Sequence, residues 1–279
     1  MPESYIHPSF FIIGERKCGT SSLYRYLVDH PNVLPCKWKE PQFFSKDSDY
    51  IEEHIEEYFQ LFPLREANED IEFVWPELNQ QGILYHEDVR IKREKGLQYV
   101  SGEASANTFH EVDPAIVFRY LPNIKLIVLL RDPVARAHSH HRMFQRFREE
   151  GRAFAMDTGS FEADMEKEIL KLREGKHSEF LSPGIYIRNL QKWGSVFPSS
   201  QIKVLFNHDL LTHPQAVMDT LLDWLEYPSY DYGPLLQKKF NQAPPARMPE
   251  RIKYLLQDFY APFDRELAAY LKRNLPWQE

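Results

Sequence analysis

The residues with the clearest chemical potential lie in a loop near the start of the chain. Gly14 and Gly19 bound this loop, which contains Arg16 and Lys17 and leads directly into three hydroxyl residues at 20–22. A short apolar run precedes the loop, and a segment with helical spacing of apolar residues follows it. Loop amides and the positive end of a helix dipole together favour a bound phosphate. The stretch therefore predicts an anion site; the alternative is an ordinary strand-to-helix turn that uses glycines for tight geometry.

The loop has the spacing of a P-loop but departs from it at one residue. A Walker P-loop has the pattern G-x-x-x-x-G-K-[ST]. Gly14 and Gly19 keep that spacing, but Thr20 takes the place of the lysine, which lies inside the loop as Lys17. A lysine at this place would lie beside a leaving-group oxygen instead of capping a γ-phosphate. Because an arginine also precedes the candidate Walker B aspartate, Asp132, a magnesium-dependent NTPase is the weaker interpretation.

Two carboxylates have positions suited to proton transfer. Glu40 lies between a lysine and Pro41 and precedes paired aromatics, so it is either a general base beside the transfer site or a solvated glutamate. Glu103 ends a predicted strand at 97–103 and is followed by Ser105. Because ligands of open α/β sheets bind at the carboxyl ends of strands, Glu103 and Ser105 should face the same crevice as the loop lysine. The alternative for Glu103 is a buried residue that caps a helix.

A second anion site is predicted after the apolar strand at 125–130. Arg131 leaves this strand, and Ser139 lies two turns into the helix that follows. An arginine fork and a hydroxyl make a suitable clamp for a dianionic phosphate. Histidines at 138, 140 and 141 lack the i, i+4 spacing of a metal-binding pair, so they predict a polar helix surface and no metal site.

The pattern of apolar residues predicts an α/β protein. We expect a P-loop-like three-layer fold in which a central, mostly parallel sheet is flanked by helices. Ser48 or Asp49 should cap the helix at 48–62, and residues 250–272 should form either one closing helix or a pair of helices broken at Pro262. Strands are expected at 10–13, 97–103, 125–130 and 201–206, and helices at 48–62, 113–121, 161–174, 214–226 and 250–272 and after residues 20, 132 and 185.

Two segments stand apart from this alternating pattern. Residues 63–98 are polar and irregular, with a short helix expected at 83–94, and form a candidate substrate-binding insertion. A proline-rich strap and helices close the chain at 238–279. We expect one domain over 1–279.

Composition narrows the class of protein further. The 279 residues carry a net charge of −7, which argues against a general nucleic-acid binder because such proteins have a basic surface. The two cysteines, Cys18 and Cys36, indicate no disulfide framework and fit a reducing compartment; Cys18 is either a small loop residue or a reactive thiol. No signal peptide is evident, and the apolar run at 10–13 is too short to span a membrane. We expect a cytoplasmic protein with no membrane or nucleic-acid partner.

Five motifs, in order along the chain, resemble those of a known family. The family is that of carbohydrate-type sulfotransferases, which use 3′-phosphoadenosine-5′-phosphosulfate (PAPS) and include the heparan sulfate N- and 3-O-sulfotransferases and the chondroitin 6-O type enzymes. The resemblance covers residues 8–250. The motifs lie at 16–23, 39–44, 102–105, 131–139 and 184–198.

The resemblance implies a role for each matched position. Lys17 would hold the oxygen that bridges phosphate and sulfuryl group, and Arg131 with Ser139 would bind the 3′-phosphate. Glu40 resembles the catalytic base of the family, and Glu103 is the second candidate. The expected cofactor-binding residues are Arg16, Lys17, Cys18, Gly19, Thr20, Ser21, Ser22, Arg131, Ser139, Tyr186 and Arg247. The expected acceptor-binding residues are Glu40, Gln42, Phe44 and Ser105.

Two departures from the family bear on the cofactor and the acceptor. Pro245 and Ala246 replace the Lys-Gly of a C-terminal loop, so a lysine contact to the nucleotide is either missing or comes from Lys238 or Lys239. Ala104 stands where the heparan enzymes carry a lysine. Together with the acidic net charge, this loss disfavours a sulfated polymer as acceptor.

The sequence thus predicts an enzyme that moves a sulfuryl group from PAPS to a hydroxyl or amino group, releasing 3′-phosphoadenosine-5′-phosphate (PAP). The acceptor would be a small molecule or a glycan, and no metal would be needed. One alternative is a P-loop-like small-molecule kinase that requires ATP and Mg²⁺, and another is a non-catalytic nucleotide-binding module. The sequence does not indicate an oligomeric state.

Overall fold

The computed structural model describes residues 4–66, 70–78, 84–94, 96–152, 156, 158–238, 240 and 246–278. The chain divides into two compact units. The first unit comprises Met1–Glu15, Gly19–Leu129 and Trp193–Pro244, and the second comprises Arg16–Cys18, Leu130–Lys192 and Pro245–Glu279. A single domain over 1–279 stays a prediction.

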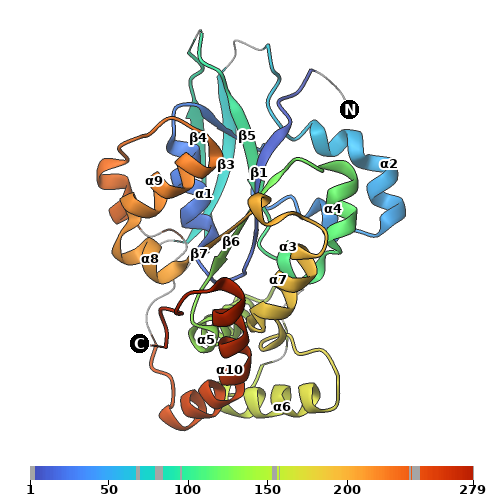
Figure 1. The fold of residues 1–279 in the computed structure, drawn as a ribbon, viewed down its shortest axis with the longest axis vertical. Coiled ribbons are helices and arrows are strands. Elements are labelled where there is room, and N and C mark those ends of the chain that lie inside the picture. The colour runs from blue at the N-terminus through green and yellow to red at the C-terminus, as the bar shows by residue number, and fades with distance from the viewer. Residues whose placement is uncertain are drawn as a thin grey trace. The chain divides into compact units, whose positions relative to one another are not determined.

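A five-stranded sheet forms the centre of the first unit (Figure 1). Its strand order is β2-β5-β1-β6-β7, and the pairs β1–β5, β1–β6 and β2–β5 are parallel. The strands are β1 (Pro8–Gly14), β2 (Val33–Pro35), β5 (Val100–Ala104), β6 (Lys125–Leu130) and β7 (Ile202–Phe206). The sequence predicts all of these except β2, whose three residues are too few for a recognisable apolar run. The predicted fold, a mostly parallel sheet flanked by helices, is confirmed.

Helices of the first unit flank this sheet. Helix α1 (Thr20–Asp29) packs against β1, β2 and β5. Helix α2 (Ser48–Phe59) is capped by Asp47, whose carboxylate accepts a 2.9 Å hydrogen bond from the amide of Tyr50, so the prediction of Ser48 or Asp49 as cap is wrong. Asp47 takes the role because its backbone is still extended, as an N-cap requires. The other helices are α3 (Thr108–Glu111), α4 (Pro114–Tyr120), α8 (Asn207–Thr212) and α9 (Pro214–Leu225).

The segment at 63–98 differs from its prediction. Instead of a helix at 83–94, β3 (Ile71–Leu78) and β4 (Leu84–Ile91) pair antiparallel, and Ile71 lies opposite Ile91. The run of β-branched and aromatic residues in β3 favours an extended strand, and a strand partner outweighs the weak helical spacing of β4. Residues 67–69, 79–83 and 95 of this segment lie outside the described residues.

The second unit is helical in its described part. It contains α5 (Pro133–Glu149), α6 (Phe161–Arg173), most of α7 (Tyr186–Gly194) and α10 (Glu250–Leu271). Pro262 lies inside α10 without ending it, so of the two alternatives the single closing helix is found and the pair of helices is not. Buried side chains on both sides of the proline, among them Tyr260 and Leu267, hold the helix in place despite the lost backbone hydrogen bond.

Short 3₁₀ turns complete the described chain. They lie at η1 (Phe43–Ser45), η2 (Ser182–Gly184), η3 (Ser199–Gln201) and η4 (Gly233–Gln237). Among the described residues, no helix combines the length and the apolar character needed to cross a bilayer. Of the predicted strap, residues 239 and 241–245 lie outside the described part.

Candidate active site

Two segments that follow strands of the first unit are joined by hydrogen bonds. The turn after β2 carries Glu40 and Gln42, and the end of β5 runs into Ser105 and Ala106. Glu40 Oε2 accepts from the amide of Ala106 at 3.1 Å, and the amide of Gln42 donates to Ser105 Oγ at 3.0 Å. Because both strands are parallel neighbours, their carboxyl ends meet at one edge of the sheet. The structure thus brings these predicted residues together.

Glu103 is the buried partner in this arrangement, with 1% of its surface exposed. The hydroxyls of Tyr58 and Ser105 donate to its two carboxylate oxygens, each at 2.7 Å. Burial raises the pKa of Glu103 to about 7; the two hydrogen bonds and Lys39 oppose this rise, and the charge of Glu40 adds to it. With both oxygens occupied and no access to solvent, Glu103 is placed to position the Glu40 turn.

Glu40 has the access that Glu103 lacks. Its side chain is 24% exposed, and its Oε1 lies 2.6 Å from the Nζ of Lys39, whose own side chain is 3% exposed. The buried ammonium and the Ala106 amide together fix both carboxylate oxygens of Glu40. Phe44, predicted to bind the acceptor, is instead buried, and its ring centroid lies 5.0 Å from that of Tyr58. An acceptor role for Phe44 stays a prediction.

The start of α1 carries Gly19 and the hydroxyl residues that the sequence predicts to bind the cofactor. Gly19 is the helix N-cap, with φ 98° and ψ 18°, a left-handed conformation that favours glycine. A Cβ there would lie 2.7 Å from Nδ2 of Asn207, so a side chain at this position would require the Asn207 amide to move. Thr20 is buried and Ser22 is half-buried. A backbone cradle at a helix N-terminus fits a phosphate group.

The second unit contains the basic loop residues and the arginine that follows β6. Arg131 donates from Nη1 to the carbonyl oxygen of Lys17 at 3.2 Å, and the Tyr186 hydroxyl donates to the carbonyl oxygen of Arg131 at 2.8 Å. Cys18 Sγ lies 3.7 Å from the same Tyr186 hydroxyl. Lys17 has φ 71° and its Nζ approaches Met143 Sδ at 3.7 Å. Lys17, Cys18, Arg131 and Tyr186 therefore form one connected set, in which Cys18 and Tyr186 are buried supports.

The histidines of α5 contradict the predicted polar surface. His140 and His141 are fully buried. His140 Nε2 lies 3.0 Å from Arg16 Nη1, and His141 Nε2 lies 2.9 Å from Oδ2 of Asp164. Each ring gains a polar partner from another segment, which the sequence of α5 alone does not reveal. Within the described residues, no three His, Cys, Asp or Glu side chains converge as metal ligands would.

All the predicted cofactor roles stay predictions, including those of Ser139 and Arg247. Ser139 is half-buried on α5, and Arg247 is exposed ahead of α10. The structure describes Lys238, whose carbonyl oxygen accepts from the hydroxyl of Tyr26 at 2.8 Å. Lys239 and Pro245 lie outside the described residues.

Sequence reasoning missed three residues that the structure ties to the site. Tyr58 contacts Glu103, and His140 with Glu179 contacts Arg16. In the sequence, Tyr58 belongs to the apolar stripe of α2, and no neighbouring residue indicates that its hydroxyl binds Glu103. Glu179 lies in a loop, and its pairing depends on segments far apart in sequence.

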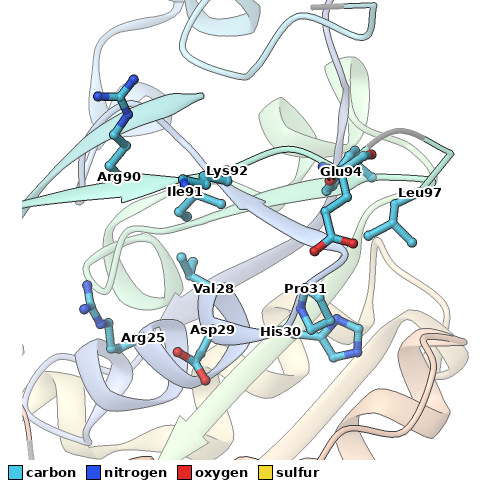
Figure 2. Close-up of a pocket in the computed structure, with 11 residues that line it drawn as sticks. Arg25, Val28, Asp29, His30, Pro31, Arg90, Ile91, Lys92, Glu94 and Leu97 are labelled. Atoms are coloured by element: carbon cyan, nitrogen blue, oxygen red, sulfur yellow. Dashed lines mark hydrogen bonds between the residues drawn. The ribbon is translucent and has the colours of Figure 1, made fainter. Parts of the chain in front are cut away.

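A cavity of about 260 Å³ lies elsewhere in the first unit (Figure 2). Val28 of α1 and Ile91 of β4 line it, with charged side chains around them. The lining residues precede β2 and β5, whereas Glu40 and Glu103 lie at the carboxyl ends of those strands. The cavity is thus at the opposite edge of the sheet, and a substrate-binding role for 63–98 stays a prediction.

The arrangement defines a class of protein: a parallel α/β sheet whose central strand leads through a glycine-bounded loop into the N-terminus of a helix. A model of the sulfotransferase family matches residues 8–232, and the chain belongs to that family. A crystal structure of a sulfotransferase from Alicyclobacillus acidocaldarius shares the fold, with a TM-score of 0.67 and 24% identity over 98% of this chain and 99% of that one.

Curated relatives are longer proteins. The chain is 28% identical over 236 residues to human bifunctional heparan sulfate N-deacetylase/N-sulfotransferase 3, which covers 82% of this chain and 23% of that protein. It is 27% identical to human carbohydrate sulfotransferase 15, over 95% of this chain and 53% of the relative. The chain therefore spans about a quarter to a half of the length of these relatives.

Proposed function

We propose that the protein is a PAPS-dependent sulfotransferase that acts on a hydroxyl or amino group of a small molecule or glycan and releases PAP. The observation that carries the proposal is the contrast between the two carboxylates in a chain of this family. Glu40 is accessible and held at both oxygens, while Glu103 is buried and occupied by two hydroxyls. A fixed, accessible carboxylate is what general-base catalysis requires.

Bound PAPS would supply the sulfuryl group, with a new bond from sulfur to the acceptor atom replacing the bond from sulfur to the phosphate oxygen of PAP. Glu40 would take the proton of the attacking O–H or N–H on a carboxylate oxygen. Lys17 Nζ and the amides at the start of α1 would stabilise negative charge on the departing phosphate. Arg131 would bind the 3′-phosphate through its guanidinium. The hydrogen bonds that hold Glu40 and Arg131 support these roles.

A thermal-shift titration tests the proposal against its alternatives. Purified protein is heated with PAP and EDTA, and in parallel with ATP and Mg²⁺. A ligand at a hundred times its Kd stabilises a protein by about 2.7 kcal/mol, a readily measured shift. We expect stabilisation by PAP without metal. Stabilisation by ATP-Mg²⁺ alone would contradict the proposal and favour a kinase.

We also propose a cytoplasmic location. Cys18 and Cys36 are both buried and form no disulfide with each other, which supports a reducing compartment. Fractionation of cells that express the full-length protein tests this proposal, and recovery from a secretory compartment would contradict it.

A further inference from the structure

Four side chains of the second unit form a connected cluster around the first basic residue of the loop. We call Arg16, Arg136, His140 and Glu179 the Arg16 brace. Arg16 Nη1 lies 3.0 Å from His140 Nε2 and 3.2 Å from Glu179 Oε1. His140 Nε2 and Glu179 Oε1 are 3.5 Å apart. On the other side of the ring, Arg136 Nη1 lies 3.4 Å from His140 Nδ1. The imidazole thus lies between two guanidinium groups.

This geometry requires a neutral His140. A guanidinium offers only donors, so a ring nitrogen that bonds to one must accept, and a protonated imidazole has no acceptor. A neutral imidazole has a single acceptor, so only one of the two guanidinium contacts is a hydrogen bond. We assign the acceptor to Nε2, which makes the shorter contact, 3.0 Å from Arg16 Nη1. Nδ1 then carries the hydrogen, and its 3.4 Å approach to Arg136 Nη1 is a packing contact. The rings of Phe144 and Phe180 pack against the imidazole, each with centroids 5.2 Å away. A fully buried ring with contacts on its faces and both nitrogens has one orientation available.

The cluster bears directly on Lys17. Lys17 has a φ of 71°, a left-handed value that is unfavourable for a residue with a side chain and persists only where neighbouring contacts hold it. Its carbonyl oxygen is held by Arg131, and the next residue, Cys18, contacts Tyr186. The preceding residue, Arg16, is held by the other members of the brace, His140 and Glu179. Loop residues 16–18 are therefore fixed at each position.

We propose that His140 is a positioning residue for PAPS binding: it holds Arg16, and through Arg16 it fixes the backbone that presents Lys17. This inference rests on the proposed function, because the ligand of the loop is taken to be PAPS. His140 touches no reacting atom. Its effect would appear as affinity for the nucleotide and would depend on the presence of Arg16.

The test compares three variants by calorimetric titration with PAP. His140→Phe keeps a flat ring but removes both nitrogens, and His140→Gln restores one polar group that can accept. His141→Gln is the matched control, because His141 is the next residue, equally buried and paired with Asp164 instead of the loop. We expect His140→Phe to weaken PAP binding about tenfold, His140→Gln about threefold, and His141→Gln less than about twofold.

A double-mutant cycle separates positioning from general loss of structure. In an Arg16→Ala background, His140→Phe should weaken PAP binding by less than about twofold, because the group through which it acts is gone. Additive losses would overturn the inference, as would full affinity in His140→Phe. If His140→Phe does not fold, Glu179→Gln loosens the brace from a side chain that is 30% exposed, and unchanged PAP affinity there would overturn it equally. Wild-type protein that fails to bind PAP would instead refute the proposed function, and the inference with it.

Discussion

Glu40 and Glu103 carry the same carboxylate group but differ in their exposure to solvent. Glu40 keeps part of its surface in solvent beside the ammonium of Lys39. Glu103 is buried, and its oxygens accept from Tyr58 and Ser105. An acceptor hydroxyl needs a carboxylate oxygen that it can reach, so the difference in exposure supports the proposed base role of Glu40 and a positioning role for Glu103.

We expect Glu40→Gln to lower turnover by about 10²–10⁴-fold, the usual contribution of a general base, while PAP affinity stays within about twofold. Glu103→Gln should lower turnover by about tenfold or less, because the amide keeps the shape and one acceptor of the carboxylate. The measurement is PAP release with an acceptor found by screening, alongside PAP titration of each variant. Near-normal turnover in Glu40→Gln, with turnover lost in Glu103→Gln, would transfer the base role to Glu103.

At the scale of elements, the junction between the loop and helix α1 favours a glycine at position 19, because the backbone there has a left-handed conformation. Gly19→Ala would place a side chain at φ 98°, which costs about 1–2 kcal/mol, and bring its Cβ to 2.7 Å from Asn207 Nδ2. We expect a lower melting temperature and PAP binding weakened about tenfold or more, because the cradle amides shift. The double variant Gly19→Ala/Asn207→Ala removes the clash but keeps the strain, so it should recover only part of the loss. Complete recovery would show that the clash alone matters.

The elements that the sequence predicts well are those whose signal is local. Strand β6 follows from its unbroken apolar run, and α4 follows from Asp113 and Pro114 at its start. The hairpin of β3 and β4 was not predicted, because strand pairing depends on a partner at a distance in the chain. Pro262 fails as a helix breaker for a similar reason: buried contacts of α10 outweigh the local cost.

In the candidate site, too, the residues with a local sequence signal were predicted and the residues that depend on distant partners were not. Glu40, Glu103 and Lys17 could be found in the sequence, because they lie in motifs beside strand ends. The residues that hold them in place could not be found in this way. In the sequence, Tyr58 has the pattern of a core residue of α2 and His140 that of a polar helix surface, whereas in the structure they contact Glu103 and Arg16. A motif marks residues that touch a ligand, whereas the residues that hold them come from segments joined only by folding.

At the scale of the whole molecule, each unit contains a buried carboxyl group with a raised pKa. In the first unit, burial raises the pKa of Glu103 to about 7. In the second, burial raises the pKa of Asp264 to about 6, opposed by a hydrogen bond from Trp277 and assisted by the charge of Asp132. His138 acts in the opposite sense, because burial and nearby cations lower its pKa to about 4. The pH dependence of stability is the sum of these opposing shifts.

The sign for Glu103 follows from proton binding. Between its ordinary value of 4.5 and about 7, the folded state holds a proton that the unfolded state releases, so the stability from this group is complete below pH 4.5 and is lost as pH rises through 7. The rise corresponds to about 3 kcal/mol, at about 1.4 kcal/mol per pKa unit. Glu103→Gln is neutral throughout, so relative to wild type its melting temperature should climb by about 5 °C between pH 4.5 and 8. Asp264→Asn is the matched variant in the second unit and should show the same climb centred nearer pH 5. A melting difference between wild type and Glu103→Gln that does not vary with pH would mean that Glu103 is ionised at all these pH values, and its positioning role would then have to rest on a buried charge.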